Sequence, residues 1–177
     1  MSAAVSEFSR PEFSRIVRLA RLGVDPFRQE IAASEAERAA LARRFDLLSL
    51  DRLTAVVELV RQRPEMILLR ASFAAEFVQS CVVTLDPVEG AVSEGFALRY
   101  GPPEAEEEAG AGTAEDDIAF EPLAADFIDI GEAVAQEFSL ALPAFPRDPA
   151  ASLEMDQPEI DDSPFTALSR LANRREP

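Results

Sequence analysis

Residues 66–85 show the clearest alternation of apolar and mixed positions in this chain. The almost wholly apolar set of alternate positions comprises Ile67, Leu69, Ala71, Phe73, Ala75, Phe77, Gln79, Cys81, Val83 and Leu85. The positions between them are mixed, which is the period-two pattern of a strand with one buried face. Because single strands rarely exceed about 10 residues, the stretch is predicted to form a bent strand or two strands in succession.

Two further alternating stretches flank this one. Residues 53–62 alternate, and Arg63-Pro64-Glu65 is a turn that would join them to the central stretch as an antiparallel pair. After turn signals at Asp86-Pro87 and Glu89-Gly90, residues 92–100 alternate again. The sequence therefore predicts an antiparallel sheet built from 53–62, 66–86 and 92–100, which can curl towards a barrel.

The N-terminal region is ambiguous between helix and strand. Within residues 13–22, Phe13, Ile16, Val17 and Ala20 match a helical face, but the adjacent Ile16 and Val17 also suit an edge strand. After a turn signal at Asp25-Pro26, residues 27–31 alternate if they are extended. We expect strands from this region to join the sheet.

Two helices are predicted from capping signals. Ser34-Glu-Ala-Glu37 has the spacing of a capping box and is followed by good helix formers, which predicts a helix over 35–44. Asp129-Ile-Gly-Glu132 has the same spacing with aspartate as the cap, and it predicts a helix over 130–142 that packs on the sheet. Strands and helices in this order indicate an α+β fold with two main helices.

Composition divides the chain into one domain and a tail. With 177 residues, a single α+β domain is expected over 1–147. It is expected to include a mobile acidic loop at about 102–118, because residues 104–117 are acidic with alanines and glycines and offer little apolar surface to bury. Residues 148–177 are expected to form an acidic linker and a short C-terminal helix that opens at Pro164.

Charge is distributed unevenly along the chain, whose formal net charge is −16. Residues 1–70 hold 12 arginines and 10 acidic residues, whereas residues 71–177 hold 5 arginines and 23 acidic residues. An acidic surface of this kind repels nucleic acid and attracts basic partners. The simpler interpretation is a solvated surface that keeps the protein soluble.

The residue types exclude most common catalytic and metal chemistry. The chain contains no histidine and no lysine, so the commonest general base, metal ligand and Schiff-base amine are all absent. Cys81 is the only cysteine; a structural zinc site needs four Cys or His ligands, and we expect Cys81 to be a buried thiol. Asp126, Asp129 and Glu132 would suit a hard cation or an acid/base hydrolase, but helix capping already accounts for Asp129 and Glu132.

The same features indicate a cytoplasmic protein without catalytic, metal or cofactor sites. No run approaches the roughly 20 apolar residues that span a bilayer, and the first residues lack the order of a secretory signal. A single cysteine cannot form an internal disulfide, which fits a reducing compartment.

Arginines of the N-terminal region are candidate RNA contacts because they alternate with phenylalanines that can stack on bases. The candidates are Arg15, Arg18, Arg21, Arg43 and Arg44. Acidic residues in the same region, Glu7, Glu12, Asp25 and Glu30, would pair with several arginines there. Direct RNA binding therefore stays open as an alternative to protein binding.

Several segments of the chain resemble the YceD family, the large ribosomal RNA subunit accumulation proteins. The resembling segments are Glu7–Arg10, Glu37–Phe45, Val78–Pro87, Ile128–Glu132, Leu140–Leu142, Phe145–Arg147 and Pro164–Leu168. The form Gln-Ser-Cys-Val-Val-Thr-Leu is similar to the alphaproteobacterial branch. The residues that match family motifs are Arg10, Glu37, Arg38, Gln79, Cys81, Asp129, Gly131, Glu132, Pro146, Arg147, Pro164 and Phe165.

The resemblance implies a part in the accumulation or maturation of large-subunit ribosomal RNA and no enzymatic activity. Many family members carry Cys-x-x-Cys in the central strand, but Val78 occupies the first of these positions here, so no metal role is carried over. We therefore expect a ribosomal assembly factor without a small-molecule substrate. Its acidic C-terminal half would bind a basic ribosomal protein or an assembly particle, or its arginine-bearing N-terminal half would bind ribosomal RNA.

Overall fold

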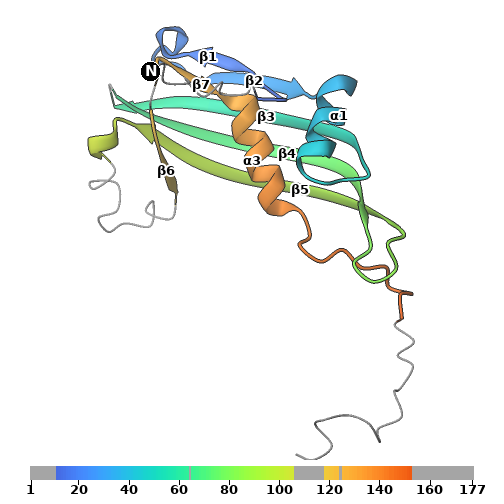
Figure 1. Ribbon diagram of the computed structural model, residues 1–177. Coiled ribbons are helices and arrows are strands. Elements are labelled where there is room, and N and C mark those ends of the chain that lie inside the picture. The colour runs from blue at the N-terminus through green and yellow to red at the C-terminus, as the bar shows by residue number, and fades with distance from the viewer. Residues whose placement is uncertain (1–10, 64, 106–117, 124, 153–177) are drawn as a thin grey trace, which may run out of the picture.

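Three long antiparallel strands form most of the sheet (Figure 1). The computed structural model describes residues 11–63, 65–105, 118–123 and 125–152. The long strands are β3 (Ser49–Arg63), β4 (Met66–Ser80) and β5 (Pro87–Gly101), each of 15 residues. β2 (Phe27–Ala32) and β6 (Ala119–Pro122) complete the sheet, whose order is β2-β3-β4-β5-β6. With two helices beside it, this confirms the α+β prediction.

The central stretch forms one strand, so of the two predicted forms the pair of successive strands was wrong. β4 stays continuous because β3 and β5 both pair with it along its length. It ends at Ser80, and residues 81–86 form the turn that leads into β5. The predicted apolar set is buried from Ile67 to Phe77 and at Cys81. Gln79 and Val83 are only half-buried, and Leu85 in the turn is 75% exposed, so the prediction fails at the end of the stretch.

The predicted turn at Glu89-Gly90 was also wrong, because both residues lie inside β5. Gly90 pairs with Phe77 of β4, and a Cβ atom on Gly90 would lie 2.5 Å from the ring of Phe77. The glycine therefore marks a position where a ring occupies the space of a side chain, and the chain does not reverse there.

The sheet is open and does not close into a barrel. Its two ends, β2 and β6, are not paired with each other. β6, which the sequence pattern did not predict, pairs with β5 in parallel, so the sheet is mixed. The ambiguous N-terminal stretch forms the short strand β1 (Ile16–Arg18) and the 3-10 turn η1 (Leu19–Arg21). β1 pairs with β7 (Phe127–Asp129) in a separate two-stranded sheet.

Both predicted helices are present. α1 (Glu35–Arg44) has the predicted bounds and a complete capping box between Ser34 and Glu37. α3 (Ile130–Ala141) begins after its cap Asp129 and lies across one face of the sheet (Figure 1). The Phe138 ring of α3 packs edge-on against three other phenylalanines, with centroid distances of 5.7 to 6.4 Å. This contact joins α3 to the sheet and to the C-terminal end of α1.

The remaining predicted elements lie mostly outside the described residues. These include residues 106–117 of the predicted acidic loop and the predicted C-terminal helix at Pro164. Before that loop, Pro103–Ala105 form the short 3-10 helix η2. No helix in the described part of the chain is both long and apolar enough to cross a membrane.

Candidate functional site

The carboxylate of Asp129 ties the N-terminus of α3 to the chain just before β1. It accepts hydrogen bonds from the amides of Gly131 at 3.1 Å and Glu132 at 3.2 Å, which are free donors of the first helical turn. It also accepts from the amide of Arg15 at 2.7 Å and the hydroxyl of Ser14 at 2.5 Å. The Asp129 carboxylate is therefore a structural cap, as the sequence predicted, and it also positions β1.

Arg15 connects the chain before β1 to α1 through a two-pronged ion pair with Glu37. The two guanidinium nitrogens donate to the two carboxylate oxygens at 2.6 and 3.0 Å. The hydrogen bond from Arg15, followed by the bonds from the amide and hydroxyl of Ser34, lowers the pKa of Glu37 to about 2. Glu37 therefore stays charged at neutral pH and anchors both the capping box and β1.

Arg44 makes the third link, between α1 and α3. Its guanidinium binds both carboxylate oxygens of Glu132, at 2.9 and 2.7 Å, and one oxygen of Glu12 at 3.0 Å. The hydrogen bond to Glu132 raises the pKa of Arg44. Glu132, predicted to complete a capping box with Asp129, thus binds α1 through its carboxylate. We call the set Ser14, Arg15, Glu37, Arg44, Asp129, Gly131 and Glu132 the α3 junction.

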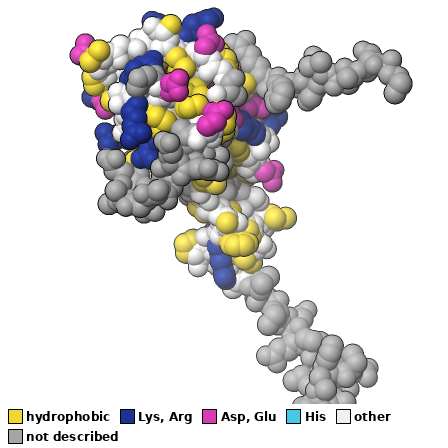
Figure 2. Space-filling view, turned by 90° about the vertical axis from the view of Figure 1, so that its left-hand side faces the viewer, with side chains coloured by type: hydrophobic (Ala, Val, Ile, Leu, Met, Phe, Trp, Pro, Cys, Tyr) yellow, Lys and Arg dark blue, Asp and Glu magenta, His cyan; other side chains and the backbone are white. Residues whose placement is uncertain are grey.

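The five candidate RNA contacts are only partly on open surface. Arg15 and Arg44 are already neutralised by carboxylates of the α3 junction. Arg18 lies 3.8 Å from Asp126, with both side chains well exposed, whereas Arg21 of η1 and Arg43 of α1 are exposed. The end of the molecule shown in Figure 2 carries both arginine and acidic side chains.

The carboxylates considered for acid/base or metal chemistry have separate partners. Asp126 is 79% exposed and lies near Arg18, while Glu132 binds Arg44 and Asp129 caps α3. Among the described residues, no group of three or more histidines, cysteines or carboxylates is placed to hold a metal ion.

Four residues matching family motifs, Gln79, Cys81, Pro146 and Arg147, lie where β4 ends, against the segment that follows α3. The amide of Val82 donates to the carbonyl of Pro146 at 2.9 Å, and the side chain of Gln79 donates to the carbonyl of Pro143 at 3.2 Å. Arg147 donates to the carbonyl of Ala151 at 3.1 Å, within the same segment. These bonds hold residues 143–148 beside the turn between β4 and β5.

Cys81 is fully buried in this turn, as predicted. Hydrogen bonds from the Thr84 hydroxyl and then from the amides of Asp148, Thr84 and Val83 lower the pKa of the Cys81 thiol to about 7. The sulfur therefore accepts bonds from both chain segments and helps to hold them together. Of the other motif residues, Arg38 donates to the carbonyl of Ala33, and Arg10, Pro164 and Phe165 lie outside the described residues.

Three glutamates from three elements on the α3 side of the sheet are close enough to interact electrostatically. They are Glu94 of β5, Glu121 of β6 and Glu137 of α3, and we call them the acidic face. Burial, together with the charges of Glu121 and Glu94, raises the pKa of Glu137. Burial and nearby carboxylates, including Glu121 and Glu137, also raise the pKa of Tyr100. Sequence analysis missed this group because the three residues are far apart in the chain.

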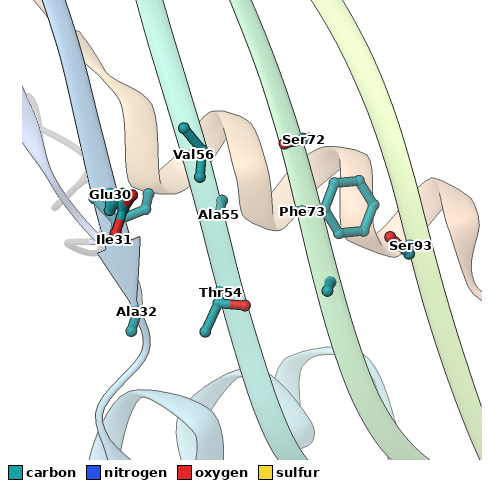
Figure 3. Close-up of a pocket in the computed structure, with 10 residues that line it drawn as sticks. Glu30, Ile31, Ala32, Thr54, Ala55, Val56, Ser72, Phe73 and Ser93 are labelled. Atoms are coloured by element: carbon teal, nitrogen blue, oxygen red, sulfur yellow. The ribbon is translucent and has the colours of Figure 1, made fainter.

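The face of the sheet opposite α3, which no described helix covers, has a shallow hollow of about 460 Å³. Figure 3 views it from the side away from α3, with Thr54, Ser72 and Ser93 on neighbouring strands. Glu30 is the only ionisable side chain among the ten residues that line it. The hollow is therefore a weakly polar depression without a second charged group.

Comparison with known families gives one match. The family described as "Large ribosomal RNA subunit accumulation protein YceD" matches residues 69–169, more than half of the chain. The matched range begins inside β4 and includes β5, the acidic face and α3, whereas α1 and the Glu37–Phe45 segment precede it. No curated protein and no solved structure matches the chain.

Proposed function

The chain belongs to the YceD family of large ribosomal RNA subunit accumulation proteins, and from this premise we propose that it is a non-enzymatic factor in large-subunit biogenesis. The family description implies a role in the accumulation of large-subunit ribosomal RNA. The molecular step that we propose is the binding of a basic ribosomal protein at the acidic face. Binding would shield the positive charge of that protein until it meets RNA.

The acidic face is the observation that carries this proposal. Glu137 is partly buried near Glu94 and Glu121, and its raised pKa reflects both desolvation and like-charge repulsion. A lysine or arginine from a partner would relieve this repulsion when it approached the three carboxylates. The fold therefore holds a charge arrangement that a cationic side chain would stabilise.

The charge of the whole molecule supports the same partner class. A net charge of −16 speeds encounter with basic proteins and slows encounter with the RNA backbone. Two of the five candidate RNA-binding arginines, Arg15 and Arg44, already hold the α3 junction together. Direct RNA binding is therefore the competing outcome of the following test.

We expect tagged protein to retain basic ribosomal proteins after the lysate is treated with nuclease. A protein–protein contact through carboxylates does not need RNA, so digestion should leave the captured proteins in place. Mass spectrometry of the bound fraction before and after digestion measures this. Loss of every basic protein together with the RNA would favour direct RNA binding and contradict the proposal.

Glu137→Gln is expected to weaken capture of the basic partner by about three- to tenfold, because one of the converging charges is removed. The same change should raise the melting temperature at pH 7 by about a few degrees. Because the folded state raises the pKa of Glu137, the ionised carboxylate is destabilising above that pKa, and this penalty disappears as pH falls below the unfolded value of about 4.5.

The control is Glu65→Gln, which removes one charge at an exposed position next to the start of β4. Partner affinity is measured for each variant, and melting temperature is measured at pH 7 and pH 4. The Glu65→Gln control should have the same affinity and the same melting temperatures as the unaltered protein. Equal capture by the Glu137→Gln and Glu65→Gln variants would show that the acidic face is not the contact.

A further inference from the structure

β5 has a long edge that no described strand covers. β4 pairs with β5 from Pro87 to Tyr100, but β6 pairs with β5 only from Leu98 to Gly101. Along residues 87–97, β5 therefore has a paired side and, among the described residues, no strand on its other side. Figure 1 shows this edge running from β6 towards the turn before β5.

The exposure of these residues agrees with an open edge. None of residues 87–97 is buried, whereas Leu98 and Arg99 beside β6 are. In an antiparallel strand, alternate residues direct their N–H and C=O groups away from the partner strand. Such a row of backbone groups is a template for a further strand from another chain.

We propose that an extended segment of the basic partner adds to this edge of β5 as a further strand of the sheet. This inference rests on the proposed function and assigns it a binding surface. Residues 87–97 contain Glu89 and Glu94 and no arginine. Glu94 lies on the α3 side of the sheet with the acidic face, and Glu89 lies on the other side, because alternate residues of a strand face opposite ways.

The charge pattern selects the occupant. In an added strand, alternate side chains would lie on the α3 side, where basic residues would approach Glu94, Glu121 and Glu137. The main-chain bonds would supply affinity regardless of sequence, and the carboxylates would select basic segments. The expected ligand is therefore an extended segment with lysine or arginine at alternate positions.

The chain's own residues before β6 are a poorer occupant. The parallel register pairs Leu98 with Ala119, so continuing it backwards would place Glu115 beside Glu94. Asp116 and Asp117 follow Glu115 in sequence. Like charges on neighbouring strands are destabilising, which disfavours self-pairing along 87–97 and leaves the edge to a basic segment.

The other end of the sheet is a shorter site. β2 has only six residues, and the guanidinium of Arg15 donates to the carbonyl of its last residue, Ala32, at 3.0 Å. Part of that edge is thus already used by the α3 junction. The free part of β5 is longer and is beside the acidic face.

The test uses the full chain with a synthetic peptide that alternates lysine and valine, and a control peptide in which glutamate replaces lysine. Hydrogen exchange should show new protection at alternate amides of residues 88–97 with the lysine peptide and none with the glutamate peptide. Failure of the lysine peptide to bind, protection elsewhere only, or equal binding of both peptides would overturn the proposal.

Variants separate backbone pairing from charge. Of Ala91→Pro and Val92→Pro, one removes an N–H that points to β4 and the other removes an N–H at the edge, because adjacent residues donate to opposite sides. The variant that keeps its melting temperature is the edge variant, and it should lose peptide binding. If it binds the peptide like the unaltered protein, strand addition is excluded.

Glu94→Gln should weaken peptide binding by about fivefold, while the matched change Glu30→Gln on β2 should have no effect. If the two variants bound the lysine peptide with equal affinity, Glu94 would not contribute to selecting a basic segment. The capture experiment after nuclease treatment tests the proposed function separately from this inference about the β5 edge. If the edge variant captured the same amount of basic protein as the unaltered protein does, that result would support the proposed function but would exclude the β5 edge as the binding surface.

Discussion

Gly131→Ala is expected to lower the free energy of unfolding by about 3 kcal/mol. A Cβ atom at this position would lie 2.5 Å from the carbonyl oxygen of Phe13 and 2.9 Å from the amide nitrogen of Arg15. These are backbone atoms, so no rotation of a side chain can make room. The N-terminal segment would have to move from α3, which would lengthen the hydrogen bonds of the α3 junction.

Urea denaturation of the unaltered protein and the variant measures this loss. Gly23→Ala is the matched control, because a Cβ atom on Gly23 would have nothing within 4 Å. Unfolding midpoints that agree for the two variants would show that the close approach of Phe13 to α3 contributes nothing to stability.

Asp129→Ala is also expected to lower the free energy of unfolding by about 3 kcal/mol. The change removes the acceptor of four hydrogen bonds, which come from Ser14, Arg15, Gly131 and Glu132. Loss of a helix cap alone costs about 1 kcal/mol. The remainder comes from the two donors before β1, which are left without this partner in a partly buried position.

Asp126→Ala and Asp129→Asn test this division in the same denaturation experiment. The carboxylate of Asp126 is exposed and lies 3.8 Å from the guanidinium of Arg18, and the backbone bond from Leu19 to the Asp126 carbonyl does not need the side chain, so Asp126→Ala should leave stability unchanged. Asparagine keeps an oxygen that can cap a helix, so Asp129→Asn should be less damaging than Asp129→Ala. If Asp129→Ala lowered the free energy of unfolding no more than Asp126→Ala does, the described role of Asp129 would be contradicted.

Features decided by local sequence were predictable. The capping box at Ser34 and Glu37 gave the bounds of α1, because its hydrogen bonds join residues only three apart. The alternation in residues 67–77 identified the buried face of β4, because the pleat itself separates the two sets of side chains.

Features decided by distant partners were not predictable. β4 remains one strand because β3 and β5 pair with it along its length. β6 forms because its four residues pair with the end of β5. Glu132 has the spacing of a capping box, but Arg44 of α1, which is 88 residues away in sequence, binds its carboxylate. No local pattern contains these pairings.

The candidate site follows the same division. Cys81 was correctly predicted to be buried from its place in the apolar set, although it lies just beyond the end of β4. The acidic face depends on the packing of α3 against the sheet, which brings Glu137 near Glu94 and Glu121. The sequence shows many glutamates and gives no sign that these three interact.

The contact between Ser14 and Asp129 joins residues that are 115 positions apart. During synthesis, β3, β4 and β5 can pair as soon as each emerges, because their connections are short. The residues before β1 must wait for β7 and α3, which are translated much later. Completion of this fold is therefore a late event in translation, and a nascent chain that ends before residue 129 presents an N-terminal segment without its docking partner.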